Sequence, residues 1–199
     1  MRTAAIDSLV DAVDAALANG DGSDRARCDG MRPAMAALLA AADPIPAWAY
    51  EPYEGEAVGN LLHADPDGRF HVLAVVFPEG TSSGVHHHGC WGVIGYLQGG
   101  DEETRYDDER AETSRHVWHQ GDITYLLPDE GEGWHRVRNP GPGTGVSVHV
   151  LCRLPADHPH AFYDRSTGKV VPFPFVEVAP NRWRAMLSQG KRLFGSSRT

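Results

Sequence analysis

The sequence has little positive charge and no long apolar run, and both shortages narrow the choice of function. Its 199 residues include 18 Lys and Arg against 27 Asp and Glu, a formal net charge of -9. Binding to a phosphate backbone needs clustered basic side chains, so we expect no nucleic-acid partner. The longest uninterrupted apolar run covers the nine residues 34–42, far below the roughly 20 residues of a membrane span, so we expect no membrane partner either.

Cysteine is also scarce. Cys28, Cys90 and Cys152 are odd in number, widely spaced and without a Cys-x-x-Cys pair. This pattern predicts reduced thiols rather than a disulfide framework or a thiolate zinc site. Three aspartates interrupt the apolar stretch of the first 20 residues, where a secretory signal would need an unbroken apolar segment. We therefore expect a cytoplasmic protein.

Two amphipathic helices are expected at the start of the chain. Apolar residues recur at spacings of three and four over residues 6–17, and the Asn-Gly pair that follows tolerates the left-handed geometry of a helix end. Pro33 suits the first turn of a second helix, which two further prolines end after residue 43. Residues 1–45 are therefore predicted to form a helical extension that serves as a lid or a buttress.

From Trp48 onward, short strand-like segments alternate with turns rich in Gly, Pro and Asp. Such segments, without helical periodicity between them, predict an all-β domain over residues 46–178, built as a closed or double-sheet antiparallel barrel. The expected strands are 58–63, 70–77, 92–97, 103–106, 114–118, 123–127, 135–138, 146–151 and 170–176. Residues 179–199 are predicted to contain a last helix, over 181–194, and a frayed tail.

Histidine is the residue type in excess. Seven of the 11 histidines lie between His86 and His149. His86 and His88 are two residues apart, so on an extended strand their imidazoles project from one face, whereas His87 projects from the other. His135 follows a strand and a tight acidic glycine turn, and a neighbouring strand would carry it to the same place. Three imidazoles on adjacent strands can hold one face of a metal ion.

These residues resemble the two sequence motifs of the cupin superfamily. Gly80, His86, His88 and Gly99 match the first motif, and Gly121, Pro128, His135 and Asn139 match the second. The resemblance implies a double-stranded β-helix, or jelly-roll barrel. Many cupins add a glutamate ligand three to five residues after the histidine pair, but positions 91–93 hold no acid.

Among cupins with three histidines and no glutamate, the sequence is similar to the thiol dioxygenases, including cysteine dioxygenase and mercaptopropionate dioxygenase. The similarity covers residues 65–168, and its anchors are the runs at 68–89, 88–91, 134–139, 147–149 and 160–168. It implies a non-haem Fe(II) site with His86, His88 and His135 as ligands, where a small thiol and O2 yield a sulfinate. Affinity order alone favours other divalent ions over Fe(II), so nickel or zinc can occupy the site in purified protein.

Two positions depart from that family. Asn60 stands where an arginine would bind the carboxylate of cysteine, and Leu151 stands where a tyrosine would take part in proton transfer. We therefore expect a substrate other than L-cysteine, either another thiol or another metal-chelating small molecule. Ser147 and His149 alternate toward one face and are candidates for a catalytic hydroxyl–imidazole relay, although His149 can equally be a satisfied core histidine. Six further residues are candidates to line the substrate pocket: Arg69, Cys90, Trp91, Tyr125, Trp134 and His160. Arg138 and Arg153 are two more cationic candidates to bind an anionic group of the substrate.

Two other classes of function fit the same residues. In a non-redox cupin, the metal would act as a Lewis acid for isomerisation, decarboxylation or hydrolysis. In a binding or sensing module, the barrel would hold a small ligand without turnover. Cupin barrels commonly pair through their sheets, which makes a homodimer plausible.

Overall fold

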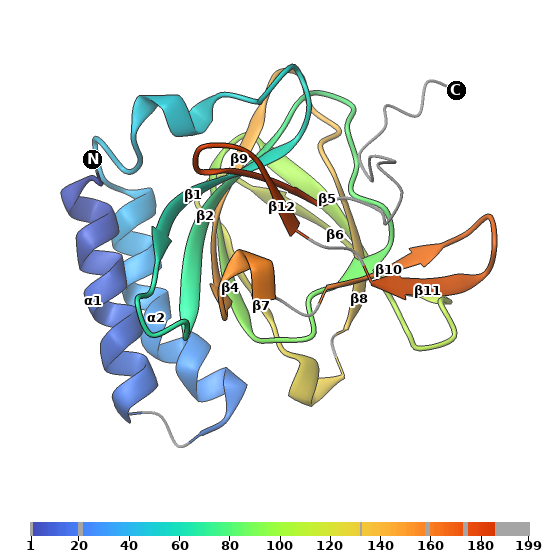
Figure 1. Cartoon of the computed structure of the whole chain (residues 1–199), viewed down its shortest axis with the longest axis horizontal. Coiled ribbons are helices and arrows are strands. Elements are labelled where there is room, and N and C mark those ends of the chain that lie inside the picture. Colours follow the sequence, from blue (N-terminus) through green and yellow to red (C-terminus); the bar gives the residue numbers. More distant parts are fainter. Residues whose placement is uncertain (1, 20–21, 132, 158–159, 173–174, 186–199) are drawn as a thin grey trace.

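The computed structural model describes residues 2–19, 22–131, 133–157, 160–172 and 175–185. Helices α1 (Ala4–Asn19) and α2 (Asp24–Leu39) lie side by side against the outside of a β-barrel, and the remaining elements are strands and short 3-10 helices (Figure 1). The 3-10 helices are η1 (Ala47–Tyr50), η2 (Pro128–Glu130) and η3 (Pro155–Asp157). Within the described ranges, no helix has the length and apolar character needed to cross a membrane.

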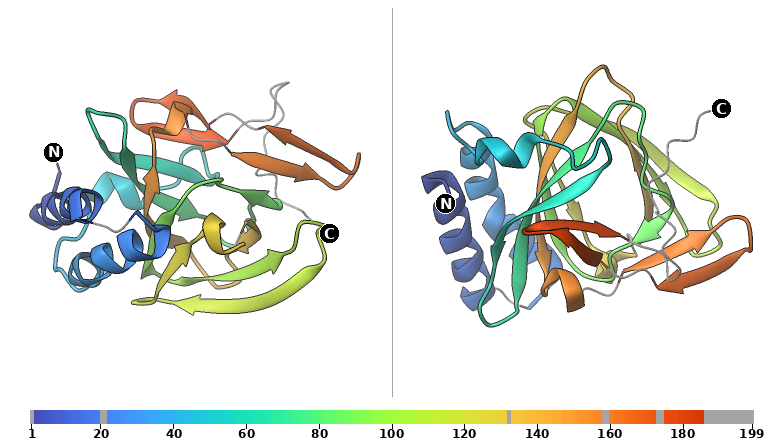
Figure 2. Two further views of the ribbon diagram at one scale, coloured as in Figure 1. Left: turned by 90° about the horizontal axis from the view of Figure 1, so that it is seen from below. Right: turned by 45° about the horizontal axis from the view of Figure 1, so that its top comes forward.

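Two antiparallel sheets build the barrel (Figure 2). The seven-stranded sheet has the order β12 (Phe175–Ala179), β13 (Arg182–Ala185), β1 (Val58–Ala64), β2 (Phe70–Phe77), β9 (Gly145–Cys152), β4 (Gly92–Gln98) and β7 (Ile123–Leu126). The six-stranded sheet has the order β11 (Lys169–Pro172), β10 (Ala161–Asp164), β3 (His86–His87), β8 (Trp134–Arg138), β5 (Gly100–Tyr106) and β6 (Glu112–His119). This arrangement is a double-stranded β-helix with two N-terminal helices, which confirms the predicted fold class.

The seven-stranded sheet is covered on both faces, which explains its apolar strands. Along β2, Val72, Ala74 and Val76 belong to the same buried cluster as the helices. The alternate residues Leu73 and Val75 point into the barrel, where they line a pocket. Because successive side chains of a strand point to opposite faces, a strand buried on both faces reads as one continuous apolar run.

The two helices act as a buttress. Met35 of α2 reaches Gly95 of β4 so closely that a Cβ atom on Gly95 would lie 2.6 Å from the Met35 sulfur. Ile6, Leu9 and Val13 of α1 are fully buried in the same cluster. Since helical packing fills the outer face of this sheet, the interior of the barrel is the face that remains for chemistry.

The second helix begins earlier than its sequence pattern predicted. Ser23 caps α2 by accepting a hydrogen bond from the backbone N–H of Ala26, and Pro33 lies inside the helix rather than in its first turn. The cap satisfies one of the unpaired N–H groups at a helix start, and a single proline removes only one internal hydrogen bond. Met31, Met35 and the other buried residues of α2 provide the packing that offsets that loss.

The C-terminal part of the chain also differs from expectation. The eight strands expected between residues 58 and 151 are present, but the ninth, at 170–176, falls in two strands of different sheets, β11 and β12, with residues 173–174 outside the described ones. Residues 182–185 form β13 rather than the start of a helix, and residues 186–199 lie outside the described ones. Backbone pairing explains why residues 182–185 form a strand, because β13 is hydrogen-bonded to β1 on one side and to β12 on the other.

The expectation of reduced thiols is wrong for two of the three cysteines. Cys90 and Cys152 form a disulfide, and their Cα atoms are 6.0 Å apart. The sheet register causes this proximity, since Gly92 of β4 pairs with Leu151 of β9. Cys28, the third cysteine, is free and buried in α2.

Candidate metal centre

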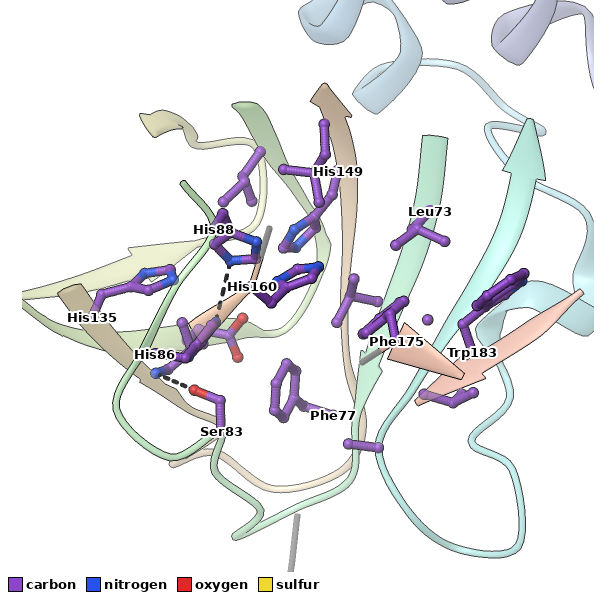
Figure 3. Close-up of a pocket in the computed structure, with 18 of the residues that line it drawn as sticks. Leu73, Phe77, Ser83, His86, His88, His135, His149, His160, Phe175 and Trp183 are labelled. Carbon is purple, nitrogen blue, oxygen red and sulfur yellow. Dashed lines mark hydrogen bonds between the residues drawn. The ribbon is translucent and has the colours of Figure 1, made fainter. Parts of the chain in front are cut away.

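Three imidazoles meet inside the barrel, as the spacing of the histidines predicted. His86 on β3 is the register partner of His135 on β8, and His88 follows directly after β3. One nitrogen from each ring lies within 4.8 Å of the other two (Figure 3). His87 points away from this group and packs its ring against Trp134, with ring centroids 4.5 Å apart.

The hydrogen bond of His86 identifies Nε2 as the nitrogen that could bind an ion. His86 Nδ1 lies 3.0 Å from the Gly84 carbonyl oxygen, so it is the protonated nitrogen and Nε2 carries the lone pair. The Nε2 atoms of His86 and His88 are 3.2 Å apart. Two nitrogens bound at about 2.1 Å to one ion in octahedral or tetrahedral geometry lie about 3.0–3.4 Å apart, which agrees with this spacing.

His135 supplies the third nitrogen. Its Nε2 is buried and has no hydrogen-bond partner, which is costly for a polar atom unless a ligand occupies that side. Burial, followed by the proximity of His135, lowers the pKa of His86 well below its usual value, so that ring is neutral as a metal ligand must be. The donor set therefore fits a divalent cation.

Glu103 contacts His135 on the side of the ring that faces away from the other two histidines. The sequence alone did not identify this residue. Its carboxylate accepts hydrogen bonds from His135 Nδ1 at 2.8 Å and from the Trp118 indole at 2.9 Å. Burial alone would raise the pKa of Glu103, but the hydrogen bond from His135, the charge of Arg105 and the hydrogen bond from Trp118 lower it to about 2. A carboxylate on the outer nitrogen fixes the ring orientation and makes the inner nitrogen a better ligand.

A pocket opens from the three histidines into the barrel. Its wall is mostly apolar and aromatic, and none of the described residues that line it is Arg or Lys. An apolar wall of this kind favours a ligand with a hydrocarbon body. The lining is formed by Ala57, Val58, Gly59, Leu73, Val75, Phe77, Ser83, His86, His88, Ile94, Tyr96, Asp101, Glu103, His135, Val137, His149, Leu151, His160, Phe175 and Trp183.

Three more of the predicted site residues, His149, Leu151 and His160, line this pocket. The His149 Nε2 atom lies 2.8 Å from Ser147 Oγ, a hydrogen bond that joins the predicted relay pair, although Ser147 itself is not part of the lining. Burial, followed by His135, lowers the pKa of His149 to about 3, so its ring is neutral. The His160 ring lies 5.0 Å from that of His88 between centroids.

Asn60 and the arginines do not lie in this pocket. The Asn60 side chain is fully buried and donates to the carbonyl oxygens of Ala49 and Glu51, so it anchors the segment before β1. Arg69 is exposed and pairs with Asp65 at 2.6 Å and with Asp14 at 2.5 Å. Two further candidate cations are also exposed and absent from the lining, namely Arg138 and Arg153.

The other predicted pocket residues serve the core or neighbouring surfaces. Cys90 and Trp91 belong to the buried cluster between the barrel and the helices. Tyr125 packs on the edge of that cluster, and Arg32 lies over its ring. Trp134 is buried between the His87 ring and the guanidinium of Arg110, which lies 3.8 Å from its ring centroid. These four predicted side chains are absent from the lining of the histidine pocket.

Comparison with known proteins gives likenesses of fold. No protein-family model matches the chain. An uncharacterized conserved protein with a double-stranded β-helix domain from Klebsiella pneumoniae subsp. pneumoniae MGH 78578 is 18% identical, with a TM-score of 0.47 over 59% of this chain and 88% of that chain. A cupin domain from Bordetella pertussis Tohama I is 18% identical, with a TM-score of 0.39 over 52% of this chain and 100% of that chain.

A third solved structure, an RmlC-like cupin family protein from Methanocaldococcus jannaschii, is 16% identical, with a TM-score of 0.41 over 52% of this chain and 88% of that chain. None of these likenesses bears on the reaction. The fold and the candidate site are therefore described from the strand order and the inward-facing histidines of this chain alone. The chain has a double-stranded β-helix fold, with a cluster of three histidines that can bind a divalent metal ion.

Proposed function

We propose that the protein is a non-haem Fe(II)-dependent dioxygenase of a small thiol other than L-cysteine. The observation that carries this proposal is the donor set, three neutral imidazoles without a carboxylate ligand, facing a largely apolar pocket. Three neutral histidines would hold a divalent ion without offsetting its charge. Such an ion would supply the chemistry for a reaction between a thiolate and O2.

The bound metal and the side chains of the protein would have different roles in the reaction. Bound Fe(II) would bring the thiolate and O2 together, and the thiol R-SH plus O2 gives the sulfinic acid R-SO2H. Both oxygen atoms enter the product, and sulfur loses the four electrons that O2 gains, so no further reductant is needed. His86, His88 and His135 would hold the ion, while Glu103 orients His135. The apolar wall would exclude water from the reacting groups.

The pocket explains why we place L-cysteine outside the proposal. A bidentate arginine is the usual protein partner of a small carboxylate. Asn60 points its amide at backbone carbonyls instead, and no described lining residue is Arg or Lys. His149 and Ser147, 2.8 Å apart, remain the pair that would hold a proton beside the metal centre.

The test is oxygen consumption by protein that has been loaded anaerobically with Fe(II). We expect O2 uptake with at least one small thiol, with sulfinate as the product by mass spectrometry, and no uptake by the metal-free protein. His87→Ala should retain uptake, because His87 points away from the centre. A fully loaded protein that consumes no O2 with any thiol would refute the proposal and favour a non-redox cupin or a ligand-binding barrel.

A further inference from the structure

One acidic side chain in the pocket is neither a metal ligand nor a partner of one. Asp101 lies on β5, two residues before Glu103, and both side chains point into the barrel. Its exposed fraction is 4%, and its Oδ1 atom is buried with no hydrogen-bond partner. A buried carboxylate oxygen without a partner costs free energy, so its presence in a ligand pocket points to a group that binds there.

Glu103, the other acidic residue of the pocket, differs from Asp101 because its carboxylate has partners within the protein. Glu103 has His135, Trp118 and Arg105 as partners, with the Arg105 guanidinium 3.3 Å away. Its charge is therefore already balanced by groups of the protein. Asp101 has no such cation, because no Arg or Lys is found among the described residues of the lining.

The pocket that Asp101 lines contains several aromatic side chains. Tyr96, Phe77, Phe175 and Trp183 line the same pocket, and the last three are labelled in Figure 3. Burial, followed by the charges of Glu103 and Asp101, raises the pKa of Tyr96 well above its usual value, so its hydroxyl is protonated. Aromatic faces attract a desolvated ammonium group through their quadrupole, and a carboxylate adds a charged acceptor.

We propose that Asp101 binds the positively charged amine of a small ligand whose other end reaches the three-histidine centre. The contact of that other end with the metal rests on the proposed function, whereas the recognition of an amine by Asp101 does not. A carboxylate ligand would meet the like charge of Asp101, and none of the described residues that line the pocket is an Arg or Lys that could offset it. The pocket therefore selects an amine on a short apolar chain over a carboxylate on the same chain.

The raised pKa of Asp101 agrees with a carboxyl group that has no Arg or Lys partner among the described residues of the pocket. Burial, followed by the charge of Glu103, raises its pKa to about 7. The carboxyl group is thus only partly ionised at neutral pH while it is alone. An ammonium group at hydrogen-bond distance would favour the ionised form.

The first experiment tests recognition without the metal. Propylammonium, propanol and propionate are titrated into the metal-free protein, and binding is followed by ligand-observed NMR. We expect propylammonium to bind about tenfold or more tightly than the other two, a difference of about 1.4 kcal/mol or more. Asp101→Asn, which keeps the shape and removes the charge, should abolish the preference. Equal binding of the three probes by the wild type, or an unchanged preference in Asp101→Asn, would overturn the proposal.

Glu102→Gln is the matched control. Glu102 is the next residue of β5, it carries the same charge and it is absent from the pocket lining. Since its side chain points to the opposite face, this variant should keep the preference for propylammonium. Loss of the preference in Glu102→Gln as well would mean that the net charge of the protein, rather than Asp101, attracts the amine, and would also overturn the proposal.

The second experiment separates this proposal from the thiol chemistry. Protein loaded with Co(II) is titrated with aminopropanethiol, mercaptopropanol and mercaptopropionate, while the cobalt absorption spectrum reports on the metal end. Aminopropanethiol should bind more tightly than the other two thiols, and Asp101→Asn should lose this preference while it keeps its cobalt. That result would support both the contact of the amine with Asp101 and the contact of the thiol with the metal. A preference for propylammonium in the first experiment with no spectral change from any thiol would leave Asp101 as an amine site and refute the thiol ligand. Mercaptopropionate binding most tightly would overturn the amine site.

Discussion

Replacing Glu103 with glutamine should weaken metal binding without dismantling the centre. In the native protein the carboxylate lies 2.8 Å from His135 Nδ1, and both side chains are almost fully buried, at 3% and 5% exposure. The amide oxygen of glutamine can still accept the same hydrogen bond, so the ring keeps its orientation. The substitution therefore removes the negative charge that makes the His135 Nε2 atom a stronger ligand.

The size of the effect follows from the role of the carboxylate behind His135. Outer partners of metal-bound histidines typically contribute about 10- to 100-fold in metal affinity. That range corresponds to about 1.4–2.7 kcal/mol, close to the usual contribution of a hydrogen bond to a charged group. We expect Glu103→Gln to bind Co(II) or Zn(II) more weakly by this factor, while the far-ultraviolet circular dichroism spectrum stays unchanged.

The assay is a competition titration against a chelator of known affinity. Glu102→Gln serves as the control, since it removes one charge from the same strand outside the pocket lining. Its metal affinity should stay within about twofold of the wild type. If Glu103→Gln bound metal as tightly as Glu102→Gln, the carboxylate would contribute nothing through His135, and its proposed role in the centre would be refuted.

Two further predictions concern stability. Because the pKa of Asp101 is raised from 3.8 to about 7, the folded state holds this proton more tightly than the unfolded chain. The stability that this proton contributes is fully present below about pH 4 and is lost as the pH rises to about 7. Asp101→Asn cannot lose it. Measured by urea unfolding of the metal-free proteins, the free energy of unfolding of the variant relative to the wild type should therefore rise by up to about 4 kcal/mol from pH 4 to pH 7. A difference that does not change with pH would contradict this. Cys90 and Cys152 close a loop with a sequence separation of 62, so the Cys90→Ser, Cys152→Ser double variant should lose about 2–4 kcal/mol in the same assay. Unchanged stability would show that the bond does not contribute.

Local patterns in the sequence predicted the cluster of three histidines, because two of them lie two residues apart in one extended segment and the third follows a matching turn. The alternation of β2 and β9 likewise reveals which residues face inward. Along β9, Val148 and Val150 belong to the outer core, whereas His149 and Leu151 line the pocket. Period-two alternation carries this information without any knowledge of the partner strands.

Proximity between distant segments was not predictable in the same way. Glu103 meets His135 only because β5 pairs with β8, and in the sequence it stands in a charged segment that resembles an exposed edge. The alternation of Asp101, Glu103 and Arg105 toward one face was the signal that could have revealed it. The Cys90–Cys152 disulfide depends on the register of β4 against β9, and spacing along the chain does not encode that register.

The strand β13 illustrates a conflict between local and long-range preferences. The apolar residues near Trp183 have a spacing that suits a helix, but backbone pairing with Gly59 and Asn60 of β1 determines the structure. The Trp183 ring stacks on that of Phe175, with centroids 6.4 Å apart, at the far wall of the pocket. Tertiary pairing therefore overrides the helical pattern here.

The central claim, that three imidazoles hold one ion, is tested most directly by the metal content of two histidine variants. Protein purified without a nickel column is loaded anaerobically with Fe(II), desalted and analysed for bound metal per chain. We predict about one ion in the wild type and in His87→Ala, because His87 packs on Trp134, and loss of the ion in His135→Ala. Equal retention in the two variants, or no bound metal in the wild type, would contradict the claim.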